Sequence, residues 1–508
     1  MKQDSNDALK ILVKGAGFVY FGMIFSKILT YLYRIVIARI GTSEYGIFSL
    51  GLAIINMVMF IPLLGMDEGI VRYVSYYLGL KEDAKIKGTI TTALKISGFL
   101  SLIVTTILFF SSEYIAINIL REQSLNIILN VLTLSIPFYV ISTIYLSVIK
   151  AYKRMDYWVF IKSITENISK IGITFILIFK GFGLLAAAIG YTVSLIIACI
   201  IAIMIVEFKF VKIFSSKIKS ITSTRKLIGY SWPIMFHIII AQLLGWTDTL
   251  MIGYFKNSIE VGIYNAALPT AHVMTIIPAG IFSLSIPIMT DLYAQKQKNE
   301  FINVYQTANK WVYYFMVYLL IIFTIFSKEI LNILFGSEYV IGSLTLIAGA
   351  IGYFIYSIGS GDCILKVIGK TKYIMINTLI STTLNIILNY FLIPRYGMLG
   401  AAAASTISLG VWTFLGFIES YYITKIHPFK KGFIKITIIG IITYVLTNLL
   451  NKYLIVSVMK LALGLISAAL IFIFLIIITK TLDREDKAIL NAIKNKITKQ
   501  ILTKILHL

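Results

Sequence analysis

Two cations lie inside the first apolar segment of the chain. Residues 26–39 read SKILTYLYRIVIAR, within a segment from about Gly15 to Ile40 that is apolar enough to cross a lipid bilayer. A cation at the centre of a spanning helix costs roughly 2.5–3.5 kcal/mol on insertion scales, so it is usually paired or functional. Lys27 and Arg34 are seven residues apart, about two helical turns, so they share one helix face. Such a face is suited to binding a phosphate or a pyrophosphate.

A second charged stripe lies in the fifth apolar segment. Lys162, Glu166 and Lys170 follow one another at four-residue steps, which places them on one stripe of a helix. Glu166 can neutralise one lysine and leaves the other uncompensated. Lys95 is the remaining cation within an apolar segment, and we expect it to snorkel to the membrane surface. The charges inside the membrane are therefore mostly positive, which favours an anionic substrate.

The acids that lie clearly within apolar segments are Glu166 and Asp248. Asp248 follows Arg34 by 214 residues and lies at a similar depth in its own segment. We expect these two side chains to face each other and to form a gating ion pair. An ion-coupling role, in which the carboxylate binds a proton or sodium, is the alternative for Asp248 and also for Glu166.

The sequence contains no pattern of catalytic or metal-binding residues. Cys199 and Cys363 lie in apolar segments, and the four histidines are scattered without metal-ligand spacing. No nucleotide loop or paired carboxylates occur, and the longest predicted outer loop has only about fifteen residues. We therefore predict a protein that is not an enzyme, with no catalytic residues, no metal and no cofactor.

The composition is that of an integral membrane protein. Hydrophobic residues make up 58% of the 508 residues, charged residues 14%, and the mean hydropathy is +0.88. These values exclude a soluble globular protein and a disordered one. The first apolar segment is too long for a signal peptide and carries internal charge, so we expect it to be kept as a span.

We predict an all-α integral membrane protein with about fourteen transmembrane helices. The predicted spans are 15–38, 46–66, 88–110, 125–149, 158–179, 183–206, 228–252, 261–289, 311–327, 343–365, 373–393, 399–424, 433–451 and 460–479. With this count, most of the 46 Lys and Arg residues fall in the loops on the side of the amino terminus. The positive-inside rule then places both termini in the cytoplasm, in a multi-pass protein of the cell (plasma) membrane.

An internal repeat divides the predicted spans into two lobes. GLLAAAIGYTVS (residues 183–194) matches GMLGAAAASTIS (residues 397–408) at six of twelve positions, and YGIF from Tyr45 weakly matches VGIY from Val261. We predict two pseudo-twofold-related six-helix lobes plus two extra helices. The domains are an N-lobe (1–208), a basic cytoplasmic linker (209–227), a C-lobe (228–425), spans 13 and 14 (426–480) and a basic amphipathic cytoplasmic tail (481–508).

The net charge of +23 is explained by the membrane rather than by nucleic acid. In the tail, isoleucines recur every four residues among lysines, as in a helix that lies on a membrane surface. We expect membrane lipids, including anionic inner-leaflet headgroups, as partners. We expect no nucleic-acid partner, and we expect the protein to be a monomer.

Several stretches resemble the oligosaccharide-lipid flippases of the multidrug/oligosaccharidyl-lipid/polysaccharide exporter superfamily, and lipid II flippases are similar too. The stretches are SKILTYLYRIVIARIGTSEYGIFSLGLAI from Ser26, AYKRMDYWVFIKSITENISKIG from Ala151, WTDTLMIGYFKNSIEVGIYNAALP from Trp246, and LFGSEY and NYFLIPRYGMLGAAAASTIS from Leu334 and Asn389. The resemblance implies a two-lobed carrier whose first span presents Lys27 and Arg34 to a central cavity. Lipid II flippases have a further arginine in the second span; residues 46–66 contain none, and we expect Lys162 and Lys170 to supply that charge.

The predicted function is the movement of a prenyl-pyrophosphate-linked oligosaccharide or cell-wall precursor to the outer leaflet by alternating access. The predicted substrate-binding residues are Lys27, Arg34, Lys162 and Lys170, with Glu166 and Asp248 in gating or ion coupling. The alternative is a cation-coupled multidrug exporter on the same fold. That function requires buried acids, of which this chain has few.

Overall fold

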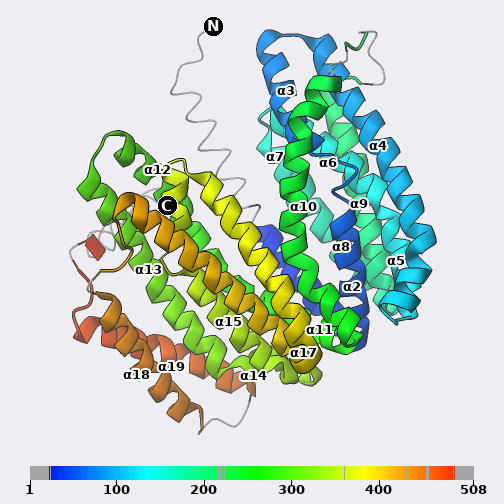
Figure 1. Ribbon diagram of the computed structural model, residues 1–508. Helices are drawn as coiled ribbons and strands as arrows, with labels where there is room; N and C mark the ends of the chain where they lie inside the picture. Colours follow the sequence, from blue (N-terminus) through cyan, green and yellow to red (C-terminus); the bar gives the residue numbers. More distant parts are fainter. Residues whose placement is uncertain are drawn as a thin grey trace, which may run out of the picture. The chain divides into compact units, whose positions relative to one another are not determined.

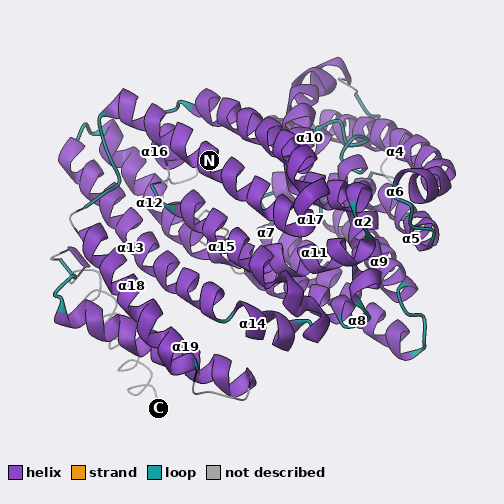
Figure 2. Ribbon diagram, turned by 60° about the horizontal axis from the view of Figure 1, so that its bottom comes forward, coloured by secondary structure: helices purple, strands orange, loops and turns teal. Residues whose placement is uncertain are grey.

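The computed structural model describes residues 22, 24–213, 219–221, 224–359, 361–430, 432–452, 457–483 and 485–486. Over these residues every regular element is a helix, and Figure 2 shows the helices joined by short loops. The chain divides into two compact units, Met1–Asn265 and Ala266–Leu508. The all-α fold predicted from the sequence is confirmed for the described residues.

The first unit starts with a helix over residues 24–38, which we call the first helix. Figure 1 labels the α-helices that follow, and α8 packs along α9. The elements are α2 (Thr42–Val58), α3 (Met66–Leu80), α4 (Asp83–Tyr114), η1 (Ile115–Ile119), α5 (Ser124–Thr133), α6 (Ser135–Ala151), α7 (Met155–Trp158), η2 (Val159–Thr165), α8 (Glu166–Phe179), α9 (Leu185–Lys209), α10 (Thr224–Phe255) and α11 (Ser258–His272) as far as Asn265. Both η1 and η2 are π-helices.

The second unit begins within α11, at Ala266. Within it α12 packs on α13, α15 packs on α17, and α18 lies beside α19. Its elements are η3 (Val273–Thr275), α12 (Ile276–Ala294), α13 (Lys298–Ile325), α14 (Ser327–Leu334), η4 (Ser337–Gly342), α15 (Ser343–Ser357), α16 (Gly361–Val367), α17 (Thr371–Thr424), α18 (Gly432–Asn451) and α19 (Ser457–Ile478).

Among the described residues, nine helices are long and apolar enough to cross a membrane, or ten if the bent α10 counts as one span. A multi-pass membrane protein is therefore confirmed, and the count of fourteen spans stays a prediction. The counts differ because helices and predicted spans do not coincide. The predicted span 46–66 covers α2 and the turn before α3. In contrast, α17 runs through two predicted spans, with a kink at Gly397 (φ 55°, ψ −135°).

The helix α10 is broken and belongs to the first compact unit. Its parts Thr224–Ile240 and Gly245–Phe255 meet at an angle of 48°. It packs on α2 and α3, where glycine allows close approach. A Cβ at Gly65 would lie 2.3 Å from the Ser231 carbonyl oxygen, and Gly65 also has φ +70°, which favours glycine.

The boundary between the compact units therefore lies within α11 and not at the linker 209–227. Residues 214–218 and 222–223 of that linker lie outside the described residues. The lobe boundaries taken from the repeat stay a prediction, because the repeat concerns topology and the compact units concern packing.

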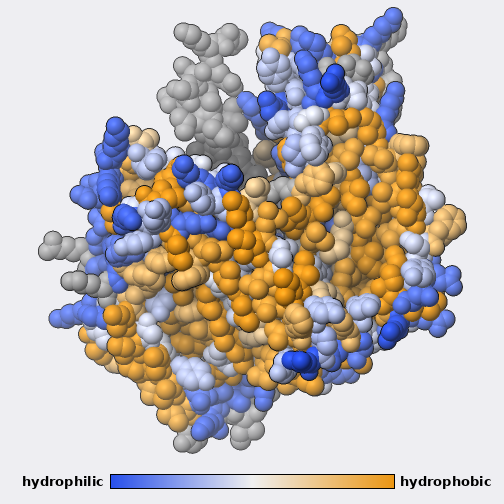
Figure 3. Space-filling view, viewed as in Figure 1, coloured by the Kyte–Doolittle hydropathy of each residue, from blue (hydrophilic) through white to orange (hydrophobic). Residues whose placement is uncertain are grey.

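In the view of Figure 3, apolar side chains cover much of the surface of each unit, and hydrophilic side chains gather at the edges of the picture. Phe110 and Phe208 are each 80% exposed, and Phe179 is 77% exposed. A soluble protein does not leave so much contiguous apolar surface in water. These side chains are placed to contact lipid.

The amino-terminal turns of α2 and α11 are in backbone contact at the second pair of repeated sequences. A Cβ at Gly46 would lie 1.7 Å from the Ser258 carbonyl oxygen, and one at Gly262 would lie 2.0 Å from the Thr42 carbonyl oxygen. The hydroxyl groups of Ser43 and Ser258 are 2.9 Å apart. Each repeated glycine thus gives room to the backbone of the other repeat, and this contact lies within the first unit.

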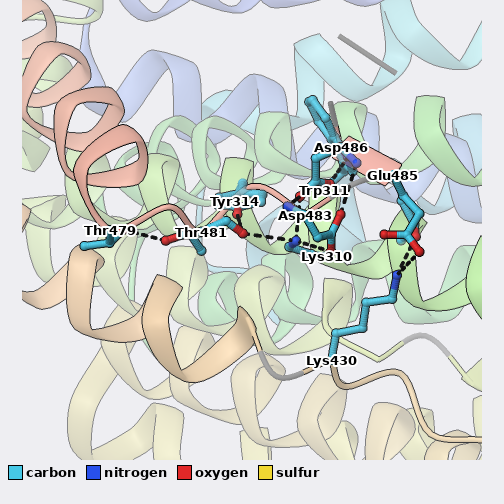
Figure 4. Close-up of polar contacts among 10 residues, drawn as sticks. Lys310, Trp311, Tyr314, Lys430, Thr479, Thr481, Asp483, Glu485 and Asp486 are labelled. Atoms are coloured by element: carbon cyan, nitrogen blue, oxygen red, sulfur yellow. Dashed lines mark hydrogen bonds and ion pairs between the residues drawn. The ribbon is translucent and has the colours of Figure 1, made fainter. Parts of the chain in front are cut away.

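A buried lysine ties the segment after α19 to α13 (Figure 4). Lys310 is 2% exposed, and its Nζ lies 2.6 Å from Asp483 Oδ2 and 2.5 Å from Asp486 Oδ2. Trp311 Nε1 donates to Asp486 Oδ1 at 2.9 Å. We call these four residues the lysine clasp. Of the predicted tail, residues 484 and 487–508 lie outside the described residues.

The two aspartates also bond to each other's backbone. The Asp486 N–H donates to Asp483 Oδ1, and the Asp483 N–H donates to Asp486 Oδ2, both at 3.0 Å. This reciprocal pattern is a capping box, typical of the first turn of a helix. Burial opposes ionisation of Asp483, but the hydrogen bonds from Lys310 and from the Asp486 N–H outweigh it and lower the pKa of Asp483.

We expect Gly46→Ala to lower the midpoint of thermal unfolding, because the added Cβ must displace the Ser258 carbonyl group. Overpacking of this kind costs about 1–3 kcal/mol. Gly98→Ala in α4 is the matched control, since nothing lies within 4 Å of a Cβ there. The midpoint is measured in detergent, by heating samples and quantifying the protein that stays folded by size-exclusion chromatography. Equal midpoints for both variants would contradict the close contact.

We expect Lys310→Met to destabilise the protein by about 3–5 kcal/mol, because two carboxylates would lose their buried partner. Lys298→Met, at an exposed position of α13, is the control. Equilibrium unfolding in detergent at several pH values measures the stability of both variants.

The effect of Lys310→Met should depend on pH. The pKa of Asp483 is lower in the folded state than in the unfolded state, where it is about 4. The ionised carboxylate therefore adds to the free energy of unfolding above that unfolded pKa, and this stabilisation is lost as the pH falls through the folded pKa. The stability difference between wild type and Lys310→Met should therefore shrink in acid. A difference that is independent of pH would show that the ion pair does not stabilise the clasp.

Candidate functional site

The first helix and α8 lie against each other, and a buried asparagine joins them. Asn167 is 3% exposed; its Oδ1 accepts a hydrogen bond from Thr30 Oγ1 at 3.2 Å, and its Nδ2 donates to Ser26 Oγ at 3.1 Å. The Tyr33 hydroxyl donates to the Ala187 carbonyl oxygen at 2.9 Å, which ties the first helix to α9. The predicted cationic helices are therefore neighbours in the first unit.

The acid of the charged stripe is paired with the first of its two lysines. Lys162 Nζ lies 2.9 Å from Glu166 Oε2, and the two side chains are 34% and 12% exposed. Lys162 Nζ also lies 5.4 Å from the ring centre of Tyr139, a cation–π contact. Glu166 thus neutralises Lys162 and leaves the second lysine of the stripe without an ion-pair partner among the described residues.

That second lysine, Lys170, is 6% exposed and is held by aromatic rings. Its Nζ lies 5.0 Å from the ring centre of Tyr33 and 5.9 Å from that of Tyr191. Among the residues that the structure describes, no carboxylate forms an ion pair with it. The charged groups that act on it electrostatically are Glu166, Lys162 and Arg34. Four charged side chains, three of them cations, therefore share this region.

Arg34 is half-buried and points toward α2 and α11. One guanidinium nitrogen donates to the Tyr45 hydroxyl and to the Asn265 carbonyl oxygen, both at 3.4 Å. The Tyr45 hydroxyl donates to the same carbonyl oxygen at 3.1 Å. These bonds are long, and a guanidinium group has five N–H donors, so Arg34 keeps capacity for an anion.

Asp248 reaches the same turn of α11 from α10. It is 6% exposed and accepts a short hydrogen bond from the Tyr264 hydroxyl. The next residue, Asn265, bonds to Thr249 through its side chain at 3.2 Å. Arg34 and Asp248 therefore contact consecutive residues of α11. The direct ion pair between them that we expect from the sequence stays a prediction. The repeat offset gave no sign of the tyrosine and the asparagine that these two side chains contact.

The remaining predicted cation, Lys27, is exposed on the first helix. Lys27 follows Ser26 in the chain, and Ser26 bonds to Asn167 of α8. The helix that carries Lys27 is therefore held against α8. The structure thus places Arg34, Lys162, Lys170 and Glu166 in one region, with Lys27 on an exposed face and Asp248 at α11.

Sequence reasoning missed the neutral residues of the site. They are Tyr33, Tyr45, Tyr139, Asn167, Tyr191, Tyr264 and Asn265. Polar residues at four-residue spacing in the first helix (Ser26, Thr30) and around α8 (Ser163, Asn167) were the available signal. In the part of the chain that the structure describes, no three His, Cys, Asp or Glu side chains form a group that could hold a metal. The groups present can bind and orient an anion.

Comparison with known proteins gives matches over most of the chain. An uncharacterized membrane protein of Methanocaldococcus jannaschii is 22% identical over 454 residues, covering 85% of this chain and 88% of the relative. A probable low-salt glycan biosynthesis flippase of Haloferax volcanii is 26% identical over 264 residues, covering 49% and 53%.

Solved structures share the fold. The lipid II flippase MurJ, in an inward closed conformation, matches with a TM-score of 0.70 at 18% identity, over 90% of this chain and 97% of that chain. An inward-facing multidrug resistance transporter matches with a TM-score of 0.65 at 12% identity, over 79% and 94%. At these identities the matches show a common fold.

Two family models match the sequence. The MatE model matches residues 233–391. The model described as polysaccharide biosynthesis protein matches residues 12–293, more than half of the chain, including the first helix, α8 and the contact between α2 and α11. The chain belongs to the polysaccharide biosynthesis protein family.

Proposed function

We propose that the protein is a flippase for a prenyl-pyrophosphate-linked oligosaccharide or cell-wall precursor. It moves this lipid from the inner to the outer leaflet of the cell membrane by alternating access. The observation that carries the proposal is Lys170, a cation that is 6% exposed, lies between two aromatic rings and has no ion-pair partner among the described residues. A cation that is uncompensated within an apolar span is costly unless a ligand supplies the opposite charge.

The surrounding groups suit a pyrophosphate. Arg34 has spare guanidinium donors, Lys162 is 34% exposed beside Glu166, and Lys27 is exposed on the neighbouring helix. Arginine and lysine bind phosphate oxygens through charge-assisted hydrogen bonds. In this proposal the pyrophosphate lies among these cations while the prenyl chain stays in lipid.

The proposed topology has about fourteen spans, in two six-helix lobes followed by two extra helices, with both termini in the cytoplasm. The distribution of Lys and Arg between alternating loops supports it. The proposed protein is a monomeric carrier without enzymatic activity. Its partners are the lipid-linked glycan and membrane lipids, including anionic headgroups of the inner leaflet.

Alternating access needs an outer closure that can open. We propose that the turn of α11 at Tyr264 and Asn265 is part of it, because Arg34 and Asp248 both bond there. The backbone contact of Gly46 and Gly262 lies in the same pair of helices. A pyrophosphate that draws Arg34 away from Asn265 would weaken this closure.

The second candidate is a cation-coupled multidrug exporter. The MatE model match over residues 233–391 favours it. However, the acids such a pump would use are engaged: Glu166 with Lys162, and Asp248 with Tyr264. The excess of cations near Lys170 favours an anionic substrate instead.

Transport in proteoliposomes tests the proposed function. The substrate is a fluorescent prenyl-pyrophosphate oligosaccharide, and its movement is followed by quenching from one side. Each of Arg34→Ala and Lys170→Met should lower transport by about 10- to 100-fold, since a hydrogen bond to a charged group is worth about 1.5–3 kcal/mol. Lys95→Met, exposed on α4, is the control and should transport like wild type.

Movement that neither variant reduces would refute the role of these cations. A flux of drug or cation, without movement of the glycan lipid, would favour the second candidate.

Exchanging the charges of Arg34 and Asp248 tests the closure. Because each residue reaches α11 through a different partner, the exchange rebuilds neither contact. We expect Arg34→Asp with Asp248→Arg to transport no better than either single variant in the same assay. Recovery of transport in the double variant would show instead that the two charges pair directly during the cycle.

A further inference from the structure

The segment that carries Lys162 is a π-helix. In η2, Val159–Thr165, backbone N–H groups bond to carbonyl groups five residues earlier, and the Glu166 N–H, at its end, donates to the Ile161 carbonyl oxygen. The Thr165 hydroxyl likewise donates to the Phe160 carbonyl oxygen at 3.0 Å. The sequence VFIKSIT contains neither proline nor glycine. Its wider turn must therefore be stabilised by contacts with the surroundings.

Asn167 supplies such contacts. Its Nδ2 donates to the Ser163 carbonyl oxygen at 3.0 Å and lies 3.5 Å from the Lys162 carbonyl oxygen. The end of a π-helix leaves carbonyl groups without their usual partner four residues on. The amide of Asn167 satisfies them while the same side chain bonds to Ser26 and Thr30 of the first helix.

The π-helix also affects how the two lysines are aligned. Lys162 and Lys170 are eight residues apart, and in a regular α-helix this separation exceeds two turns by roughly 80°. A π-helix has more residues per turn, so each residue rotates less and the excess becomes smaller. Both ammonium groups interact with one tyrosine of α9: Lys170 lies 5.9 Å from the ring centre of Tyr191, and Lys162 acts on it electrostatically.

We propose that Asn167 is a positioning residue of the anion site. It holds the π-helical turn that sets Lys162 beside Lys170, and it fixes the helix of Lys27 and Arg34 against them. The inference rests on the proposed function, because it assigns the arrangement of cations around a pyrophosphate to this side chain. Polar side chains often only join helices in a membrane. Asn167 differs because it also bonds to the backbone of the turn that carries Lys162.

A double-mutant cycle separates positioning from general stabilisation. The full chain in lipid nanodiscs is titrated with inorganic pyrophosphate, and binding is measured by calorimetry. Asn167→Ala and Lys162→Met should each weaken binding by about tenfold, which corresponds to the loss of one charged hydrogen bond. The double variant should lose less affinity than the product of the two single losses, because Asn167 acts partly through Lys162.

Two further variants serve as controls. Asn167→Ser can still bond to the Ser163 carbonyl oxygen through its hydroxyl, so it should keep most of the affinity. Ser169→Ala removes a 2.6 Å hydrogen bond to the Thr165 carbonyl oxygen without touching the first helix, and it should bind like wild type. Hydrogen exchange of residues 159–166 should become faster in Asn167→Ala and stay unchanged in Ser169→Ala.

The outcomes distinguish the inference from the proposed function. If the double variant loses affinity by the product of the two single losses, or if Asn167→Ala keeps full affinity, the inference is overturned and the proposed function is not. If Lys162→Met and Lys170→Met both bind pyrophosphate as wild type does, the proposed anion site is wrong, and the role of Asn167 falls with it. Should Asn167→Ala fail to fold, Asn167→Ser decides instead. Faster hydrogen exchange of residues 159–166 with unchanged affinity for pyrophosphate would overturn the inference.

Discussion

A buried lysine that has no ion-pair partner among the described residues is the constraint on which the rest of the site depends. Lys170 is buried, and the one acid on its helix stripe is bonded to Lys162. Its charge is met by the faces of Tyr33 and Tyr191, which stabilise a cation without neutralising it. The neighbouring helices must therefore present aromatic rings at this depth, and the first helix and α9 do so.

The backbone around the site also has polar groups that need partners within the protein. In a membrane, a backbone group freed from a helix must find a partner within the protein. The π-helix η2 frees carbonyl groups beside Lys162, and Asn167 bonds to them from within its own helix. One buried amide thus bonds both to an irregular turn and to a second helix, so the elements that carry Lys162 and Arg34 are joined through it.

The packing of α10 and α11 links this site to the pair of repeats. Both helices follow the predicted linker, yet α10 and the start of α11 belong to the first compact unit. Glycine makes this possible at Gly46 and Gly262, where each backbone occupies the space of a missing side chain. The bonds of Arg34 and Asp248 then converge on consecutive residues of α11. A change in charge near Arg34 is thereby connected to a contact between the repeats.

Composition and spacing alone determined that the chain is helical and crosses a membrane, because hydropathy and helical periodicity are local properties. They predicted excess positive charge within the spans. They also placed Lys162, Glu166 and Lys170 on one stripe. Tertiary structure decided which lysine Glu166 neutralises, that two tyrosine rings contact Lys170, and that Arg34 and Asp248 contact consecutive residues of α11. Those outcomes depend on side chains from helices far apart in sequence, such as Tyr191 and Asn265. The π-helix at Lys162 was also decided by tertiary structure, because its sequence contains no proline or glycine. Asn167 bonds to its backbone and also to the first helix, which is distant in sequence.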